Sequence, residues 1–583
     1  MQGEPTSSPV TGLSSVSVVL AGSGGAGVMT AGNVLLEAAA LSGYYALMTR
    51  SSGPQIRGGE AAAMIRIACA PVECMEGSFQ VLAAVDWDNM QRFAAEIPLA
   101  GDALLVGDPA RGDPPGAFTV GGTRYKGVEL ARIAKEITGG RANMVLLGHL
   151  AALLGLPDDA LGQAAGRVLG SRPGVLEPSL AALAAGRATA VGSPAGLQLA
   201  PAPACPGGRW LLTGNEAAGL GAIKAGVRFV AAYPITPATE LLEWMSAALP
   251  ESGGVLVQAE DELASINMVI GSSFGGVPAL TATSGPGLAL MMESIGLAVA
   301  AEVPLVVIDV MRVGPSTGIP TKSEQGDLNI AIHGLHGDAP HLVLAPNGLG
   351  DCLRTTRWAV HLAEALQTPA LVLSDQFLGQ ARAVVDRPED PPFCARRLTA
   401  GQPDSEEYRR YRVTPTGVSP MAIPGTPRSA YTADGLAHSE DGTPSSQAAD
   451  HLAQLRKRRH KLERHEFGEL WADVEGDGEL VVITFGSCTG PLREALAGAR
   501  ARGLALRLVS LRLLAPLQRE RLEHLVADAS RVVVVEQNPD GQLYRYLRSE
   551  LDVEVPMDSL HKPGAQPFHP DELLDLLLQW SRT

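Results

Sequence analysis

Three short segments in the middle of the chain carry side chains suited to binding a cofactor and a small anion. Residues 233–240 read YPITPATE, residues 258–262 read QAEDE and residues 283–287 read TSGPG. They supply hydroxyl groups, carboxylates and a glycine-rich backbone, and Arg312 and Thr321 follow further along the chain. Each segment comes directly after a predicted strand, where open α/β sheets bind their ligands. The pattern therefore predicts one shared site.

Each of these residues also has a simpler interpretation. Three acidic residues follow one another, Glu260, Asp261 and Glu262. Each could cap a helix or lie on the surface, although the helix dipole stabilises a carboxylate in the first turn. The hydroxyl-bearing residues are Thr236, Ser284 and Thr321. Hydroxyls are common in caps and turns. Arg312 ends an apolar strand, so once buried it needs an acceptor on the protein or on a substrate. As an ordered set these residues favour a binding site, in which we single out Glu262.

The elements around the three segments alternate between strands and helices. Residues 227–232, 254–258, 279–283 and 304–309 have the apolar pattern of buried strands. Residues 214–225, 238–248, 261–274 and 288–301 have the pattern of helices. This alternation predicts an α/β domain in which the strand ends, and with them the three segments, converge on one edge of the sheet.

With 583 residues, the chain is too long for a single core. We predict an α/β protein with a disordered lead at 1–15, a first domain at 16–190, a linker at 191–208, a second domain at 209–385, an irregular crossover at 386–474 and a third domain at 475–583. Repeated strand–helix units favour a mostly parallel sheet in the first domain. The basic run at 454–461 in the crossover is interpreted as a solvated helix face rather than an anion site.

Composition narrows the function classes. Hydrophobic residues make up 46% of the chain and charged residues 19%, as in ordinary soluble globular proteins. The net charge of −16 argues against nucleic acid as a partner, because phosphate binding needs clustered Lys and Arg. No uncharged apolar run approaches the ~20 residues of a membrane helix. The first 15 residues are polar, without the basic start of a signal or transit peptide, so we expect a cytoplasmic protein.

The cysteines give no sign of a metal or cluster site. They are Cys69, Cys74, Cys205, Cys352, Cys394 and Cys488. None forms a C-x-x-C pair, whereas zinc and iron–sulfur sites usually need several thiolates at short spacing. We therefore predict reduced thiols and no metal on this chain.

Two glycine-rich motifs have weak functional interpretations. Residues 22–27 read GSGGAG and match G-x-G-x-x-G between a strand and a helix, where a phosphate could approach the helix N-terminus. A dinucleotide site would place an acid after the second strand. That strand ends at Arg50, which could face a 2′-phosphate, but a tight turn or another anion is favoured. Residues 476–478 (GDG) resemble the start of a thiamine diphosphate motif but precede their strand, so we predict a turn and no diphosphate–metal anchor.

Longer motifs carry a resemblance to the α subunit of 2-oxoacid:ferredoxin oxidoreductases. They are YPITP at 233–237, QAEDELASIN at 258–267, TATSGPG at 281–287 and GPSTGIPT at 314–321. The resemblance extends to a fused N-terminal γ domain through residues 22–27 and 53–59, and to residues 417–425 and 536–543. It implies three α/β domains: the γ domain, a thiamine diphosphate pyrimidine-binding domain and a transketolase C-terminal-like domain.

The resemblance also implies cofactors and partners. In this family thiamine diphosphate lies between the α subunit and a β subunit, which carries the diphosphate site, Mg²⁺ and a [4Fe–4S] cluster. A 2-oxoacid loses CO₂ after attack by the cofactor's ylide, coenzyme A accepts the acyl group and ferredoxin takes the electrons, reversibly in principle. Fusion to a γ domain is frequent in enzymes that act on 2-oxoglutarate, so we expect that substrate, succinyl-CoA as the product and an (αβ)₂ assembly.

The implied roles fall on particular residues. Glu262 matches the glutamate that hydrogen-bonds N1′ of the aminopyrimidine. The implied cofactor contacts also include Tyr233, Pro234, Ile235, Ser284 and Gly285. Arg312 and Thr321 match positions that hold the substrate carboxylate, with Thr236 beside them, and an Arg fork suits a carboxylate.

The chain departs from the family's commonest pattern at two positions, and rival functions remain open. Met421 stands where a basic residue is frequent, and Met311 precedes Arg312 where Gln is common, which leaves fine substrate selectivity open. One alternative is the same chemistry on pyruvate or on branched or aryl 2-oxoacids. An alternative of another class is a non-catalytic nucleotide- or flavin-binding electron-transfer subunit, suggested by residues 22–27.

Overall fold

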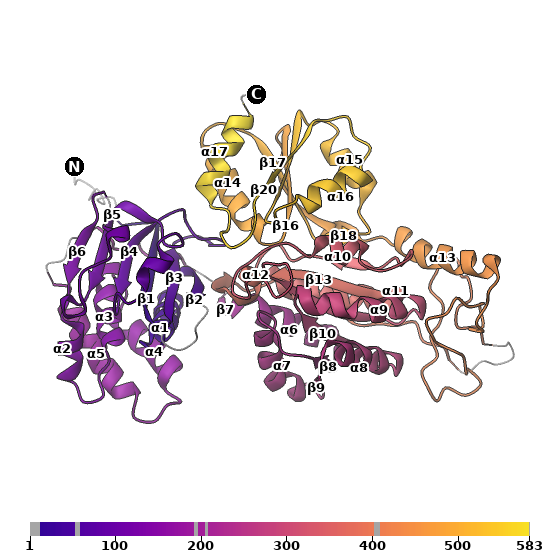
Figure 1. Cartoon of the computed structure of the whole chain (residues 1–583), viewed down its shortest axis with the longest axis horizontal. Helices are drawn as coiled ribbons and strands as arrows, with labels where there is room; N and C mark the ends of the chain where they lie inside the picture. The colour runs from indigo at the N-terminus through magenta and orange to yellow at the C-terminus, as the bar shows by residue number, and fades with distance from the viewer. Residues whose placement is uncertain are drawn as a thin grey trace, which may run out of the picture. The chain divides into compact units, whose positions relative to one another are not determined.

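The computed structural model describes residues 12–52, 59–119, 121–191, 196–204, 208–401 and 408–581 (Figure 1). The chain divides into two compact units. The first comprises Met1–Leu212, Ala381–Arg387 and His569–Asp571, and the second comprises Thr213–Gln380, Pro388–Phe568 and Glu572–Thr583. Residues 209–212 and 381–385, which the sequence assigned to the second domain, therefore lie with the first unit.

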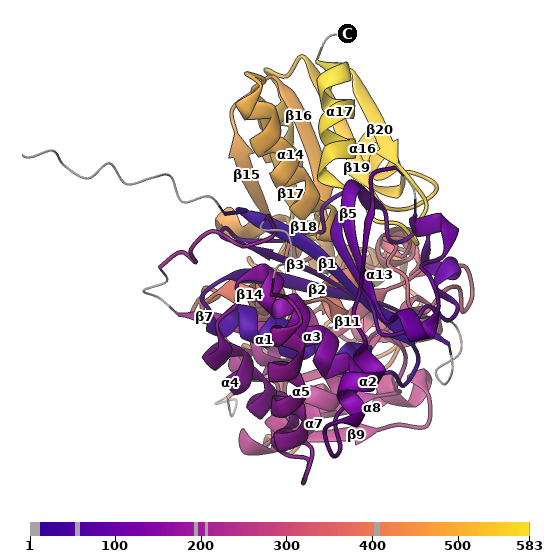
Figure 2. The ribbon, with the colours of Figure 1, turned by 90° about the vertical axis from the view of Figure 1, so that its left-hand side faces the viewer.

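The first unit contains an eight-stranded sheet with helices packed against it. The strand order is β6-β5-β4-β1-β3-β2-β14-β7. The strands are β1 (Ser15–Ser23), β2 (Tyr45–Ser52), β3 (Glu60–Ala68), β4 (Phe79–Ala84), β5 (Leu99–Gly107), β6 (Arg124–Gly127), β7 (Arg209–Thr213) and β14 (Arg382–Asp386). The helices are α1 (Val28–Leu41), α2 (Leu130–Lys135), α3 (Ala142–Leu154), α4 (Asp158–Leu169) and α5 (Leu176–Ala188), and Figure 2 shows α1, α3, α4 and α5 gathered together. Apolar residues of β1, β3, α1 and α3 form one buried cluster.

This sheet is mixed, so the prediction of a mostly parallel sheet was wrong. Strands β1, β4, β5 and β6 run parallel to their neighbours in that order. Strand β3, however, is antiparallel to both β1 and β2, and β14 is antiparallel to β2. The cause lies in the strand order: α1 connects β1 to β2, and β3, the next strand in the chain, inserts between them.

The second unit contains a seven-stranded sheet that carries the three candidate segments. Its order is β18-β12-β13-β11-β10-β8-β9. The strands are β8 (Phe229–Ala232), β9 (Val255–Gln258), β10 (Ala279–Thr283), β11 (Leu305–Met311), β12 (Leu342–Leu344), β13 (Pro369–Asp375) and β18 (Leu513–Ala515). Its helices are α6 (Gly214–Ala225), α7 (Thr239–Glu251), α8 (Glu262–Phe274), α9 (Gly285–Ala300), α10 (Leu328–His333), α11 (Asp351–Leu366) and α12 (Gln376–Gln380). Strands β9, β8, β10 and β11 are mutually parallel, so their carboxyl ends meet at one edge, as predicted.

The second unit also contains a five-stranded sheet of order β15-β17-β16-β19-β20. The strands are β15 (Ala472–Gly476), β16 (Leu480–Phe485), β17 (Leu506–Leu511), β19 (Arg531–Glu536) and β20 (Met557–His561). Helices α14 (Thr489–Ala501) and α17 (Pro570–Trp580) lie on one face, and α15 (Arg519–Val526) and α16 (Gln542–Glu550) on the other (Figures 1 and 2). Gly476 ends β15, and Asp477 and Gly478 lie in the connection to β16, where a turn was predicted.

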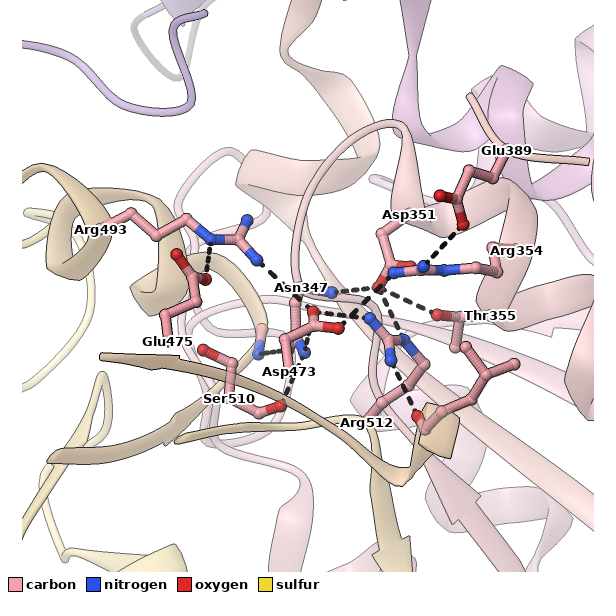
Figure 3. Close-up of polar contacts among 12 residues, drawn as sticks. Asn347, Asp351, Arg354, Thr355, Glu389, Asp473, Glu475, Arg493, Ser510 and Arg512 are labelled. Carbon is pink, nitrogen blue, oxygen red and sulfur yellow. Dashed lines mark hydrogen bonds and ion pairs between the residues drawn. The ribbon is translucent and has the colours of Figure 1, made fainter. Parts of the chain in front are cut away.

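A buried polar network joins this sheet to the start of α11 (Figure 3). The fully buried guanidinium of Arg512 donates from Nε to Asp351 (3.0 Å), from Nη2 to Asp473 (2.6 Å) and from Nη1 to the carbonyl oxygen of Leu470 (2.8 Å). Asn347 Nδ2 donates to a backbone carbonyl of β17 (3.0 Å). The strand pairing of β12 with β18 adds a further link. These contacts fix the two sheets of the second unit to each other.

The basic helix of the crossover is not a solvated face, so that interpretation was wrong. Within α13 (Ala448–Glu463), Lys457 and Lys461 are buried, and both donate to Glu302, two residues after the end of α9 (2.5 and 3.0 Å). Arg410 donates to the Glu302 carbonyl oxygen (2.8 Å). The basic run therefore binds the carboxylate of Glu302 rather than an external anion.

Candidate active site

The turn after β8 contains the first predicted segment, and two side chains bind its backbone carbonyl groups. Arg312 Nη1 donates to the carbonyl oxygen of Thr236 (2.5 Å), and Asn215 Nδ2 of α6 donates to that of Pro237 (3.0 Å). The side chains of Tyr233 and Thr236 are exposed. The neighbouring Pro234 and Ile235 are half-buried. The loop therefore offers apolar and hydroxyl-bearing surface on a fixed backbone.

Glu262 is the first residue of α8, and Asp261 caps that helix by accepting from Ala264 N (2.7 Å). The Glu262 side chain is only 7% exposed, yet within the described chain its carboxylate accepts no hydrogen bond. A Cβ at Gly287 would come within 2.7 Å of Glu262 Oε1 and 2.1 Å of Thr283 Oγ1. The carboxylate thus lies in a cradle that only a glycine leaves open.

That cradle exists because the TSGPG segment begins a helix. Helix α9 starts at Gly285, three residues before the predicted start, since proline is well tolerated in the first turn. Gly287 therefore lies in the first turn of α9, facing Glu262 of α8. Ser284, the N-cap residue, is fully buried, and its Oγ has no hydrogen-bond partner among the described residues.

Arg312 follows directly after β11 and lies beneath the surface, 6% exposed. Burial lowers the pKa of Arg312, and the nearby Asp327 carboxylate opposes that shift. Arg312 Nη1 donates to Thr236, but Arg312 Nε has no hydrogen-bond partner in the described chain. Thr321, half-buried, belongs to a loop closed by the bond from Val313 N to the Lys322 carbonyl oxygen (3.1 Å). The structure brings Arg312 into contact with Thr236, and the bond between Val313 and Lys322 connects the loop of Thr321 to the residue after Arg312.

Sequence reasoning missed two acids beneath this site, Asp309 and the half-buried Asp327. Asp309 on β11 is fully buried, and Asp327 before α10 lies so close to Gly285 that a Cβ there would be 2.6 Å from its carboxylate. A signal for Asp309 was available, because an acidic residue interrupts an otherwise apolar strand. Asp327 gave no such signal, since its loop is far from Gly285 in sequence.

The glycine loop of the first unit accommodates a protein carboxylate. Ser23 donates from both its backbone N (2.9 Å) and its Oγ (2.8 Å) to Asp86. Asn143 Nδ2 donates to the Gly27 carbonyl oxygen, and a Cβ at Gly27 would lie 2.4 Å from that nitrogen. An acidic neighbour disfavours a second anion, so the structure supports the tight-turn interpretation over a nucleotide site. Residues 53–58 of the GPQIRGG motif lie outside the described residues.

Met421 lies at the far end of α8 from Glu262. It is fully buried against Arg397, which donates to the Ser273 carbonyl oxygen near the C-terminus of that helix (2.5 Å). Eleven residues of helix correspond to roughly 16 Å. Packing against the helix end is therefore what this residue does in the fold.

No described helix is long and apolar enough to span a bilayer. Nor do the described ranges bring three or more His, Cys, Asp or Glu side chains together as metal ligands. Five of the six cysteines fall within the described residues, and all five are free thiols.

Comparison with known proteins decides the family. Three family models match successive stretches: pyruvate ferredoxin/flavodoxin oxidoreductase at 17–189, the thiamine diphosphate-binding part of pyruvate flavodoxin/ferredoxin oxidoreductase at 220–457, and core domain II of pyruvate:ferredoxin oxidoreductase at 478–573. Subunit KorA of 2-oxoglutarate synthase from Methanothermobacter thermautotrophicus is 33% identical over 376 residues, covering 64% of this chain and 99% of that protein. The chain belongs to the 2-oxoacid:ferredoxin oxidoreductase family.

Other members of the family match nearly the whole chain. A solved structure of 2-oxoglutarate:ferredoxin oxidoreductase from Magnetococcus marinus, with 2-oxoglutarate, coenzyme A and succinyl-CoA bound, is 34% identical with a TM-score of 0.89, covering 97% of this chain and 99% of that one. Subunit alpha of 2-oxoacid:ferredoxin oxidoreductase 2 from Aeropyrum pernix is 29% identical and covers 96% of each chain. The predicted family, α/β fold class and enzyme class are confirmed.

The family model over the candidate site is that of a thiamine diphosphate-binding domain. The residues fit such a cofactor, because the Glu262 side chain is 7% exposed, its carboxylate has no donor in the described chain, and it lies beside Gly287, a position with no side chain of its own. A cofactor donor at that position would pair with a carboxylate that no donor of the described chain binds.

Proposed function

We propose that this chain is the α subunit of a two-subunit enzyme that converts 2-oxoglutarate and coenzyme A to succinyl-CoA and CO₂ and passes the electrons to ferredoxin. The substrate is suggested by the Magnetococcus marinus neighbour, which matches nearly the whole chain with 2-oxoglutarate bound. The observation that carries the catalytic assignment is Glu262, a buried carboxylate lacking a donor at the site edge of the sheet.

Glu262 would act on the aminopyrimidine of thiamine diphosphate. Its carboxylate would accept a hydrogen bond from a protonated ring N1′ and so hold the proton at that nitrogen. Gly287 keeps the carboxylate in place, and Tyr233, Pro234 and Ile235 supply a surface for the ring on the facing turn. The bound cofactor supplies the electron sink for decarboxylation, and the protein orients and tunes it. Ser284 and Gly285 act through the backbone of the first turn of α9.

The substrate carboxylate would bind near Arg312, Thr236 and Thr321. One amino group of the Arg312 guanidinium already holds the Thr236 carbonyl oxygen, which fixes the orientation of the fork. A fixed guanidinium pairs well with a carboxylate. Thr236 and Thr321 would add hydroxyl donors from the two neighbouring loops.

A partner subunit would complete the site. Leu263 on α8 and Leu290 on α9 are about half exposed. Four residues after each of them, Asn267 Nδ2 of α8 donates to Ser294 Oγ of α9 (3.1 Å). Residues four apart lie on one helix face, so the two leucines form an apolar surface beside Glu262. We propose that a β subunit with the diphosphate and Mg²⁺ site and the [4Fe–4S] cluster covers this surface in a cytoplasmic (αβ)₂ assembly.

A substrate panel tests this proposal. The chain is co-expressed with its β subunit, and ferredoxin reduction is measured with coenzyme A, thiamine diphosphate and one of 2-oxoglutarate, pyruvate or a branched 2-oxoacid. We expect kcat/KM to be highest for 2-oxoglutarate, and no ferredoxin reduction by this chain alone. Preference for pyruvate would reject the substrate, and turnover without coenzyme A would reject the reaction.

A further inference from the structure

Asp309 is an unusual buried acid. Its side chain is fully buried in the middle of the seven-stranded sheet, and neither carboxyl oxygen accepts a hydrogen bond from any donor in the described chain. Its register partner on β10 is Thr283, the residue before the Ser284 cap of α9. A carboxylate buried without donors is among the costliest groups a fold can contain, so this residue requires an explanation.

Asp327 provides one: its Oδ2 is also buried without a donor in the described chain, and its carboxyl lies against Gly285, two residues after Thr283, the register partner of Asp309. The two carboxyls therefore lie at the same end of β10 and interact with each other. Although Asp327 precedes α10, its side chain makes no capping bond to that helix. Two ionised carboxylates cannot form a hydrogen bond with each other, because both only accept. Their like charges also repel, which disfavours ionisation of both groups in a buried site. A proton held between them satisfies both groups at once.

The charged groups around the pair are few. Burial raises the pKa of both carboxyls, that of Asp327 to about 6, and Glu324 adds to the shift while Arg312 opposes it. Glu324 itself accepts from the backbone N of Gly564 (2.7 Å). With one proton, the pair has a single negative charge beside the single positive charge of Arg312. A second negative charge would compete with any anion that Arg312 binds.

The pair also touches the start of α9. A Cβ on Gly285 would lie within 2.6–2.7 Å of both Asp327 oxygens, so this carboxyl packs directly beneath the first turn of the helix. The partial positive charge of a helix N-terminus stabilises one negative charge there. Asp327 therefore contacts the turn that contains Gly287, the cradle of Glu262.

The five-stranded sheet fixes Asp327 through its neighbour Gln325. Gln325 is fully buried, donates from Nε2 to the Phe485 carbonyl oxygen (2.7 Å) and accepts at Oε1 from Gln537 N (2.8 Å). Its own N donates to the Gln537 carbonyl oxygen (2.7 Å), and Asn538 Nδ2 donates to its carbonyl oxygen (3.3 Å). This loop cannot shift without breaking a set of buried bonds.

We propose that Asp309 and Asp327 share one proton and, as a pair with a single negative charge, position Arg312 and the first turn of α9 for binding of the 2-oxoacid. Neither residue touches substrate; both act through Arg312 and the Gly285 turn. The substrate part of this inference rests on the proposed function, whereas the proton sharing does not.

Two variants, Asp309→Asn and Asp327→Asn, test the pair in the assembled two-subunit enzyme. Each amide can donate to the remaining carboxylate, so each variant keeps one negative charge and the bond but loses the shared proton. Infrared spectra at neutral pH, recorded without substrate, should show a protonated-carboxyl band in the wild type that is missing from both variants. A band that persists in both variants, or is absent from the wild type, overturns the proton sharing.

The pH profile of kcat/KM for 2-oxoglutarate tests the positioning role. As the shared proton leaves at alkaline pH, the added charge beside Arg312 should raise the wild-type KM by roughly tenfold, with little change in kcat. Both variants should lack this alkaline rise, and the exposed control Asp338→Asn should match the wild type. The same rise in both variants overturns the positioning role. If the wild type does not turn over 2-oxoglutarate at all, the proposed function fails while the infrared result still decides the proton sharing.

Discussion

Replacing Arg512 should destabilise the second unit strongly, because its guanidinium is fully buried and donates to two acids, Asp351 and Asp473, in the network of Figure 3. Arg512→Met removes the fully buried guanidinium that donates to both Asp351 and Asp473 and leaves them the partly exposed Arg354 in common. Breaking a buried ion pair by removing one partner typically costs about 3–5 kcal/mol, because an uncompensated charge remains inside. We expect the free energy of unfolding to fall by about that amount.

The pKa of Asp351 gives an independent value for the free energy that this network contributes to stability. Burial would raise it, but the Arg512 and Arg354 guanidiniums hold it at about 2, against an ordinary value of 3.8. At 1.36 kcal/mol per pKa unit, this difference corresponds to roughly 2 kcal/mol. Because the folded-state pKa is depressed, the stabilisation is complete above about pH 4 and is lost as the pH falls towards about 2. Asp351→Asn should therefore cost roughly 2 kcal/mol at neutral pH and much less near pH 2.

Urea denaturation followed by tryptophan fluorescence measures both effects, since the Trp471 carbonyl oxygen accepts from Arg512 N (2.8 Å). The matched control is Arg132→Met, which removes an exposed ion pair on α2 and should leave the midpoint unchanged. The electrostatic account of this network is refuted by either of two results. One is a urea midpoint for Arg512→Met equal to that of Arg132→Met; the other is a loss of stability in Asp351→Asn that is the same at neutral and acid pH.

Three further changes test other parts of the structure. Gly287→Ala should displace Glu262 and lower kcat by roughly 10²-fold or more. The control is Gly296→Ala on the same helix, which should leave kcat unchanged because an added Cβ there has no atom within 4 Å. Arg312→Met should raise KM for the 2-oxoacid without weakening cofactor binding, and an unchanged kcat/KM would reject its carboxylate role. Glu302→Gln leaves two buried lysines without their anion and should lower the free energy of unfolding by about 3–5 kcal/mol in the same urea assay; a midpoint equal to that of the wild type would contradict this.

Local patterns predicted much of the framework of the second unit. Helix α6 spans the predicted residues 214–225, and its start is fixed by a capping box between Thr213 and Glu216. Strand β10 likewise matches the predicted 279–283. These elements are set by signals close in sequence: apolar runs, caps and turns. The convergence of strand ends on one edge followed from the parallel topology.

Long-range contacts defeated the prediction elsewhere. The basic pattern of α13 looks like a surface face because Glu302, the partner of Lys457 and Lys461, lies more than 150 residues earlier. The insertion of β3 between β1 and β2 and the pairing of β18 with β12 likewise depend on distant segments. The Asp309–Asp327 pair is of the same kind, since neither residue reveals its partner in sequence.

The central claim is that Glu262 makes this chain catalytic, and one comparison tests it most directly. Ferredoxin reduction by the assembled enzyme is measured for Glu262→Gln and for Glu260→Gln, an isosteric change at an exposed carboxylate two residues away. The account predicts that Glu262→Gln lowers kcat by roughly 10²–10⁴-fold while thiamine diphosphate still binds, and that Glu260→Gln retains wild-type activity. Near wild-type turnover by Glu262→Gln would contradict it.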